Sequence, residues 1–351
     1  MHNALVSVDA NGRFTVGGVP FVPQGVNAYS LLLLAGQNRM DDVRQVFEQA
    51  HALRRPLIRT NAFFDGGTNV ARMRNDDATL HEPGLVGLDR LLAAAAAANV
   101  RLVLTLTNNW HDFGGAHAVL RAVAPTEHLP KDAFWTDPRA IHAQRMYIDA
   151  LVQRINTVNG RAYRKDPTIF AWELANEARC ESGPTSILTN WARTMSVQLR
   201  VSGAEQLVSW GGMGYRNSYG ENAELLMQDG AIDVFTLHLY PLHRFRTQSE
   251  RAHRSRAQLA ALLGAARIRE AARIARKHRS ALLIEEFGWA PRTSDPDTER
   301  ATVYTHWLRA ADDEKIGTLP WMIGESARMD NDGFLLRLDR EPKTAHALGR
   351  T

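Results

Sequence analysis

The sequence predicts an α/β fold, a single (β/α)8 TIM barrel with a short N-terminal β-hairpin. Apolar runs of strand length recur eight times along the 351 residues, and amphipathic helical patterns separate most of them. No low-complexity linker or change of composition divides the chain. Since such barrels form one unit of about 200 to more than 400 residues, the length requires no second domain. We therefore expect one domain over residues 1–351, with residues 1–19 closing the barrel bottom; a doubly wound open sheet is the alternative.

The hairpin is indicated by residues 4–19, where apolar and polar residues alternate on both sides of Asn11-Gly12. Asn-Gly favours a tight hairpin turn because both residues tolerate a positive φ. Residues 21–27 then have the apolar character of a buried strand, and residues 41–53 carry apolar side chains at helical spacing. These segments begin the alternation of strands and helices.

The same alternation continues towards the C-terminus. Apolar runs predict the second to eighth strands at residues 57–61, 101–106, 168–180, 206–210, 233–238, 282–286 and 317–323. Helical periodicity predicts further helices at residues 87–98, 138–158, 191–201, 254–278 and 298–311.

Charge and composition argue against a nucleic-acid partner. The net charge is only +4, and the densest basic region, residues 244–279, interleaves Arg with Ala, Leu and Glu at helical spacing. That pattern is typical of a solvated helix face. No Gly-x-Gly-x-x-Gly follows a predicted strand and no Walker-type motif is present, so a nucleotide site has no support. Cys180 is the only cysteine, which excludes an intramolecular disulfide and a Cys-pair zinc site.

The N-terminal residues 1–9 lack a charged segment followed by an apolar one, as a secretion signal would require. No segment reaches the ~18 uninterrupted apolar residues of a membrane span. We expect a soluble protein without a membrane partner, cytoplasmic as the sequence stands and secreted or periplasmic if a signal peptide has been removed. The oligomeric state stays open.

Two of the predicted strands end in glutamate. The run at residues 168–180 ends its apolar part in Asn176-Glu177, and the run at residues 281–288 ends in Glu285-Glu286 before Phe287-Gly288. In an α/β barrel the active site lies at the C-terminal ends of the strands, so polar residues there are candidates. These candidates are Asn27, Arg59, Asn108, Asn176, Glu177, His238, Glu286 and Trp321.

Paired carboxylates with an arginine, a His-x-Tyr sequence and several tryptophans suit glycoside hydrolysis. In a retaining mechanism the two carboxyl groups stand about 5 to 5.5 Å apart, and strands four and seven lie nearly across the barrel from each other. Side-chain alternation predicts that Glu285 points outward if Glu286 points inward, and we expect Glu173 to be structural. No group of His, Asp and Glu has metal-ligand spacing, so we expect no catalytic metal.

Residues 169–180, centred on Asn176-Glu177, resemble the acid/base strand of glycoside hydrolase family 5, and in particular of its β-mannanases. Asn-Glu alone is a weak signal, but its combination with Glu-Phe-Gly on the seventh strand is strong, and the Asn-Asn-Trp sequence narrows the resemblance towards mannanases. The match covers most of the chain in the right order. Its further motifs lie at residues 108–115, 134–138, 156–163, 237–241 and 284–288.

The resemblance implies that Glu177 is the general acid/base and Glu286 the nucleophile. Arg59 is expected to bond Glu286 and keep it ionised, whereas Glu177 lacks such a partner, so we expect its pKa to be raised. No cofactor is implied. The implied substrate-binding residues are Arg59, Asn109, Trp110 in the pocket wall, Asn176 at the sugar 2-hydroxyl, His238 at the pocket floor near the acid/base, Tyr240 near the nucleophile and Trp321 as the sugar platform.

Two departures from the family pattern bear on the substrate. Ala178 stands where the family usually has proline, which removes a rigid turn but leaves the carboxylate. Residues 30–34 are largely aliphatic where mannanases carry an aromatic pair near Tyr29, which argues against a platform for a polymer.

The sequence therefore predicts a retaining β-glycoside hydrolase that cleaves β-1,4-mannosidic bonds in mannan or manno-oligosaccharides, as an endo-β-mannanase does. Three alternatives stay open: an exo-acting β-mannosidase of short β-mannosides, another family 5 β-glycosidase of the glucan type, and a sugar-binding protein that has lost catalysis. The expected partner is an oligosaccharide or a polysaccharide.

Overall fold

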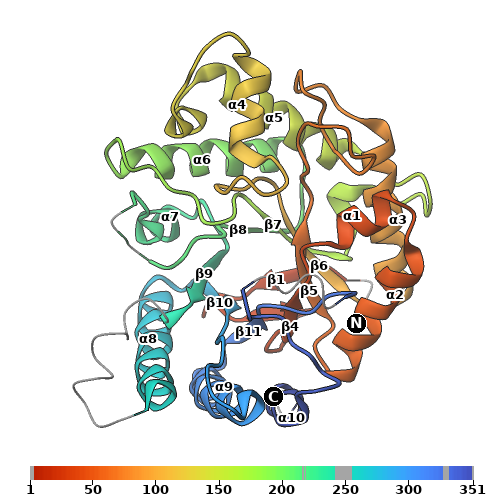
Figure 1. Ribbon diagram of the computed structural model, residues 1–351. Coiled ribbons are helices and arrows are strands. Elements are labelled where there is room, and N and C mark those ends of the chain that lie inside the picture. Colours follow the sequence, from red (N-terminus) through yellow and green to blue (C-terminus); the bar gives the residue numbers. More distant parts are fainter. Residues whose placement is uncertain (1–3, 216, 218, 242–254, 327–331, 350–351) are drawn as a thin grey trace.

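The computed structural model describes residues 4–215, 217, 219–241, 255–326 and 332–349. Its centre is an eight-stranded parallel sheet with the order β11-β10-β9-β8-β7-β6-β5-β4 (Figure 1). A parallel bridge between Gln24, next to β4, and Thr318 of β11 closes the sheet into a barrel. The strands are β4 (Gly25–Asn27), β5 (Leu57–Asn61), β6 (Arg101–Thr105), β7 (Ile169–Glu173), β8 (Leu207–Ser209), β9 (Val234–Leu239), β10 (Ala281–Phe287) and β11 (Gly317–Pro320).

Helices surround the barrel (Figure 1). All six predicted helices are present, as α2 (Met40–Ala52), α3 (Glu82–Ala97), α5 (Pro138–Gln153), α6 (Ser186–Val201), α8 (Arg256–His278) and α9 (Pro296–Asp313). The predicted end of α5 at residue 158 is wrong because Arg154 already has an extended backbone. The predicted start of α8, Arg254, lies outside the described residues.

Within the described residues, four short α-helices and two 3-10 helices were not predicted from periodicity. They are α1 (Leu31–Gly36), α4 (Gly115–Val123), α7 (Ala223–Gln228), α10 (Pro342–Leu348), η1 (Lys131–Trp135) and η2 (Tyr163–Lys165). In α1 the sequence Leu-Leu-Leu-Leu-Ala-Gly has no polar face, because the helix is buried against α3. The two helices approach so closely that a Cβ on Gly87 would stand 2.6 Å from Gly36 Cα.

A small antiparallel sheet closes the bottom of the barrel. The predicted hairpin is present as β1 (Val6–Val8) and β2 (Phe14–Val16), and a third strand, β3 (Val19–Pro20), extends it. The first barrel strand is therefore shorter than predicted, beginning at Gly25. Phe14 packs on Phe170 with ring centroids 5.4 Å apart, within a buried cluster that includes the N-terminal residues of the barrel strands.

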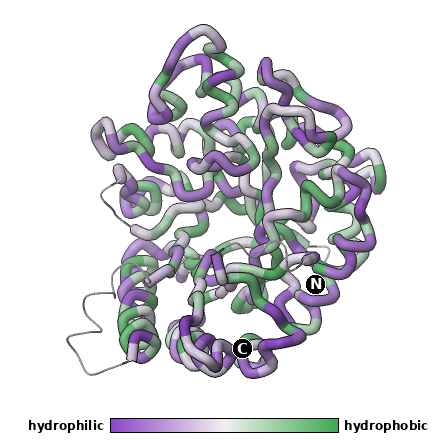
Figure 2. The backbone as a smooth tube through the Cα atoms, viewed as in Figure 1, coloured by the Kyte–Doolittle hydropathy of each residue, from purple (hydrophilic) through white to green (hydrophobic). Residues whose placement is uncertain are grey.

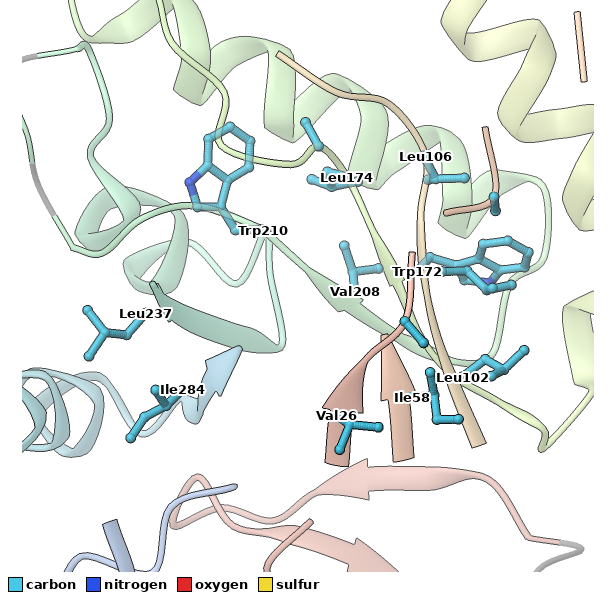
Figure 3. Close-up of a cluster of buried hydrophobic side chains, with 14 of the residues drawn as sticks. Val26, Ile58, Leu102, Leu106, Trp172, Leu174, Val208, Trp210, Leu237 and Ile284 are labelled. Carbon is cyan, nitrogen blue, oxygen red and sulfur yellow. The ribbon is translucent and has the colours of Figure 1, made fainter. Parts of the chain in front are cut away.

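Successive strand residues alternate between the helices and the barrel interior. Figure 3 shows outward-facing side chains of this alternation, among them Ile58 of β5, Trp172 of β7 and Ile284 of β10. Their following neighbours, Arg59, Glu173 and Glu285, interact with one another inside the barrel. Strands that are buried on both faces therefore carry apolar residues outward and a charged layer inward, below the C-terminal rim.

The Arg-rich helix α8 is amphipathic, as predicted. Its apolar side, which includes Ile268 and Ala271, is buried, whereas Arg269, Arg273 and Arg276 are exposed. Figure 2 shows hydrophilic and hydrophobic stretches alternating along this helix. Residues 244–254 of the basic region lie outside the described part of the chain. No helix of the described residues is both long and apolar enough to cross a bilayer.

Candidate active site

A pocket of about 830 Å³ lies at the C-terminal ends of the barrel strands. It collects residues from strands and loops that are far apart in the sequence, as the barrel topology predicts. Every residue predicted for the site lines this pocket except Asn109. The predicted residues in its lining are Arg59, Trp110, Asn176, Glu177, His238, Tyr240, Glu286 and Trp321.

Glu177 reaches the pocket through an irregular extension of β7. The strand ends at Glu173, and Glu177 has a left-handed backbone with φ of 48° while its N–H donates to Gly211 O at 2.8 Å. This turn aims the carboxylate across the pocket instead of along the strand. Glu177 Oε1 lies 2.8 Å from His238 Nδ1, and Oε2 accepts a hydrogen bond from Trp110 Nε1 at 3.0 Å.

Glu286 reaches the pocket from β10, where the pairing with β9 shifts register between Leu283 and Glu286. Its Oε1 accepts a hydrogen bond from Arg59 Nη1, and its Oε2 accepts one from Tyr240 Oη at 2.8 Å. His238 Nδ1 is 3.4 Å from the same Oε2. The carboxylate is therefore held at both oxygens by groups that stabilise its negative charge.

The prediction that Glu285 points outward is wrong. Glu285 is fully buried in the barrel, 3.8 Å from Arg59 Nε and 3.5 Å from His238 Nε2. Regular alternation from Ile284 already places Glu285 inside, and the register shift then lets Glu286 join it at the rim. A bulge of this kind cannot be recognised from residue types alone.

The two pocket carboxylates stand close together. One oxygen of Glu177, one oxygen of Glu286 and one nitrogen of His238 all lie within 4.8 Å of one another. Two carboxyl groups at this separation match the spacing of retaining glycosidases and leave too little room for the water that an inverting mechanism requires.

A family model described as GH family 5 beta-mannosidase-like matches residues 4–311. The chain belongs to glycoside hydrolase family 5. This confirms the resemblance seen in its sequence motifs, and it makes the protein a glycoside hydrolase.

Curated relatives of this family 5 enzyme include putative mannan endo-1,4-beta-mannosidase 9 of Oryza sativa subsp. japonica, 32% identical over 95% of this chain and 85% of its own length. Mannan endo-1,4-beta-mannosidase A of Podospora anserina is 30% identical over 95% of this chain and 87% of its own length. Some relatives are longer: the chain spans 54% of mannan endo-1,4-beta-mannosidase 3 of Oryza sativa subsp. japonica.

Solved structures agree with the sequence relatives. The endo-1,4-beta-mannanase from Rhizomucor miehei superposes with a TM-score of 0.79 at 26% identity, over 99% of this chain and 100% of its own. The endo-beta-1,4-mannanase from Thermotoga petrophila gives a TM-score of 0.81 at 25% identity, over 95% of this chain and 76% of its own. The barrel fold predicted from the sequence is thereby confirmed.

Arg59 organises the charged layer below the family 5 carboxylates. Its Nε and Nη2 donate to the two oxygens of Glu173 at 2.6 and 2.7 Å, and Nη2 also donates to Asn176 Oδ1 at 2.7 Å. Burial opposes the charged form of Arg59, but the surrounding carboxylates, first Glu173 and then Glu286, raise its pKa well above the ordinary value. Glu173, expected to be structural, thus fixes the arginine that bonds Glu286.

The electrostatics of Glu177 differ from the prediction. Burial by itself would raise the pKa of Glu177, but the hydrogen bond and charge of His238, together with the Trp110 bond, lower it below the ordinary value. Burial lowers the pKa of His238, but its interactions with Glu286, Glu177 and Glu285 outweigh burial and raise this pKa to about 10. His238 was expected at the pocket floor near the acid/base, but its effect on the pKa of Glu177 was not predicted.

Trp321 and Trp110 both line the pocket. Trp321 stacks on Tyr29 with ring centroids 5.6 Å apart and planes 16° apart, so an aromatic pair exists although residues 30–34 carry none. Trp110 is 39% exposed and contacts Glu177. Asn109 is only 1% exposed and does not line the pocket, whereas the preceding residue Asn108 does.

Several lining residues were not predicted from the sequence, because they lie on loops rather than at strand ends. Single aromatic, acidic or basic residues in loops carry no periodic signal, and only the folded barrel brings them together. They are Tyr29, Asp112, Phe113, Arg179, Met213, Asp332 and Phe334.

Proposed function

We propose that this family 5 enzyme is a retaining hydrolase of β-1,4-mannosidic bonds, with Glu286 as nucleophile and Glu177 as general acid/base. The observation that carries the mechanism is that one oxygen of each carboxylate lies within 4.8 Å of the other at one pocket, at the ends of two strands that are not neighbours in the barrel. The substrate assignment is supported by the relatives named as mannan endo-1,4-beta-mannosidases.

In the first step Glu286 attacks the anomeric carbon, and Glu177 gives its proton to the oxygen of the leaving sugar. Arg59 and Tyr240 hold the attacking carboxylate in place from two directions. Formation of the glycosyl-enzyme removes the negative charge of Glu286. In the second step Glu177 takes a proton from water, the water attacks the anomeric carbon, and Glu286 leaves as a carboxylate. No cofactor takes part.

Asn176 and Trp321 suit the sugar that is being cleaved. Asn176 Oδ1 accepts from Arg59, and its Nδ2 donates one bond to Asn108 Oδ1 at 3.0 Å, which leaves a second N–H for a sugar hydroxyl. Trp321, supported by Tyr29, offers an apolar ring for the C–H face of the sugar.

Aromatic residues beyond Trp321 support cleavage within a chain over trimming of its ends. Tyr29, Phe113 and Phe334 also line the pocket, so apolar surface continues past the sugar at Glu286. The ring centroids of Tyr29 and Phe113 are 5.6 Å apart in an edge-on contact, and those of Phe334 and Tyr240 are 5.3 Å apart. An endo-acting enzyme binds several successive sugars and needs such surface.

Product analysis with mannohexaose tests the proposal. We expect fragments from the middle of the chain to form before mannose accumulates, and E286Q to form none. Release of mannose alone from the first minutes would contradict endo action. Cleavage of β-glucans without cleavage of mannohexaose would contradict the substrate assignment. Binding of both without hydrolysis would identify a sugar-binding protein.

A further inference from the structure

Arg179 is a cation in the pocket that the proposed reaction does not use. It lies two residues after Glu177, lines the pocket, and makes cation–π contacts with two aromatic rings. Its guanidinium carbon is 4.5 Å from the ring centroid of Trp110 and 4.3 Å from that of Tyr219. Because Trp110 bonds Glu177, Arg179 stands on the acid/base side of the pocket, where the leaving sugar must lie.

The polar edge of Arg179 has almost no protein partner. Among the described residues its side chain makes one hydrogen bond, from Nη2 to the weak acceptor Met213 Sδ at 3.4 Å, and no ion pair, while Nε is buried without a partner. The two rings contact the guanidinium without satisfying its N–H groups, and these groups can bind a carboxylate through two parallel hydrogen bonds.

The loop holds Arg179 firmly in this position. Arg179 O accepts a hydrogen bond from Trp135 Nε1 at 2.7 Å, and the N–H of Cys180 donates to Tyr219 O at 2.9 Å. Asp132 accepts bonds from the next two backbone N–H groups, of residues 181 and 182, at 2.9 Å each. A cation that is fixed before the substrate arrives loses little entropy on binding.

The part of the pocket around Tyr29 has the opposite charge. Asp112 and Asp332 line it, and both face Tyr29, as does Glu325. Burial first, and then these three carboxylates, raise the pKa of Tyr29. An anionic substrate group is therefore repelled near Tyr29 and attracted near Arg179, which favours acidic oligosaccharides whose carboxylate lies at Arg179.

From these two observations we propose that the leaving-group side of the pocket binds a uronic acid, whose carboxylate pairs with the edge of Arg179. The preferred substrates are then acidic oligosaccharides with a β-mannosyl unit linked to a uronic acid, in addition to neutral mannosides. This inference rests on the proposed function, because it assigns the leaving-group side from Glu177 as the general acid.

Matched oligosaccharides that differ only at C6 test the inference. One pair is mannosyl-β-1,4-glucuronate and mannosyl-β-1,4-glucose; a second pair of trisaccharides carries the acid one sugar further from the cleaved bond. We expect kcat/KM for the acidic member of one pair to exceed that of the neutral member about tenfold, as a charge-assisted hydrogen-bond pair would give. The ratio falls with added salt.

Substitutions at position 179 locate the cause. We expect R179Q to bring the ratio of kcat/KM close to one, and R179K to keep part of it because the charge remains without the two-bond edge. R267Q is the matched control: Arg267 also stacks on a ring, 4.5 Å from the centroid of Tyr215, but already donates to Glu270 at 2.8 Å and does not line the pocket.

Two outcomes separate this inference from the proposed function. If the wild type cleaves neutral mannosides and shows no preference in either pair, or if R179Q keeps the preference, the uronic-acid site is wrong and the proposed function stands. If no β-mannoside is cleaved, neutral or acidic, the proposed function fails and the uronic-acid site fails with it.

Discussion

The ends of β7 and β10 face the same pocket, and each supplies two glutamates in a different way. On β7, Glu173 ends the strand inside the barrel, and Glu177 follows on an irregular turn with a left-handed backbone. On β10, Glu285 and Glu286 are adjacent, and a register shift lets both reach the interior. Two unlike sequence patterns therefore produce the same arrangement, with one carboxylate below and one at the rim.

The lower and upper carboxylates do different work. Glu173 and Glu285 are fully buried and contact the cations Arg59 and His238, whereas the upper pair lines the pocket. The cations are not shared equally: Arg59 bonds Glu286, and His238 bonds Glu177. All four residues are glutamates, so residue type does not distinguish them. Strand geometry decides which carboxylates line the pocket and which hold the buried cations.

The largest expected effect separates the two glutamates of β10. We expect E286Q to lower kcat on mannotriose on the order of 10⁴-fold or more, because the amide cannot form the glycosyl-enzyme. E285Q, one residue earlier, keeps the nucleophile and is expected to lose far less. Steady-state kinetics of both purified variants measure this. Equal losses in the two variants would contradict the division into upper and lower carboxylates.

The second effect separates the two upper glutamates. E177Q is expected to lose most activity on mannotriose, whose leaving group needs a proton, and much less on an aryl β-mannoside with an acidic phenol, which leaves without one. E286Q is expected to be inactive on both. The ratio of kcat/KM for the two substrates is the measurement, and an unchanged ratio in E177Q would argue against its role as acid.

The third effect concerns Glu173 of β7. E173Q leaves the buried Arg59 without its two-bond carboxylate partner, and we expect the free energy of unfolding in urea to fall by about 3–5 kcal/mol. Burial, partly offset by Arg59, raises the pKa of Glu173 to about 7. A carboxyl with a raised pKa in the folded state contributes less stability as the pH rises through that pKa, so the loss in E173Q is expected to be larger below pH 7 than above it.

A surface pair provides the control for Glu173. Glu82 bonds Arg154 at 2.7 Å but its side chain is 62% exposed, so E82Q is expected to change the free energy of unfolding by less than about 1 kcal/mol. A similar small change in E173Q would show that the lower layer is dispensable for stability.

The fourth effect tests the unequal sharing of cations. In the wild type His238 lowers the pKa of Glu177 against the effect of burial. H238N removes the charge, so the pKa of Glu177 is expected to rise, and a general acid with a higher pKa stays protonated to higher pH. We therefore expect the alkaline limb of the kcat/KM profile to move to higher pH.

A distant histidine serves as control for this profile. His278 lies 3.0 Å from Glu224 but does not line the pocket, so H278N is expected to leave the limb in place. An alkaline limb that does not move in H238N would contradict the assignment of His238 as the group that lowers the pKa of Glu177.

The barrel and the ends of its strands could be predicted because both depend on local pattern. Apolar runs that end in polar residues located Arg59, Glu177, His238 and Glu286, and all four line the pocket. The prediction for Glu285 failed because a register shift depends on how neighbouring strands pair, which alternation within one strand does not reveal.

The positions of loop residues could not be predicted from the sequence for a related reason. Arg179 and Tyr29 are placed by contacts with Trp110, Tyr219 and Trp321, which come from other loops. Asn109 shows what a motif alone cannot predict. Of the two adjacent asparagines only Asn108 lines the pocket, and the direction of the backbone decides which of them does.

The smallest expected effect concerns the turn that follows β7, where Ala178 replaces the usual proline. Within the described structure the N–H of Ala178 donates no hydrogen bond, so A178P removes none. We expect it to raise the free energy of unfolding by about 0.4–1 kcal/mol, because proline reduces the conformational entropy of the unfolded chain. We expect kcat/KM to stay within about twofold of the wild type.

The reason for so small an effect is that β7, unlike β10, positions its upper carboxylate through a loop that is fixed from outside. Asp132 of η1 accepts the N–H groups of residues 181 and 182, and Trp135 bonds Arg179 O. D132N weakens this support, and we expect it to lower kcat/KM more in the Ala178 background than in A178P. Such non-additivity is measured in a double-mutant cycle. Strictly additive effects would mean that η1 and the turn hold Glu177 independently.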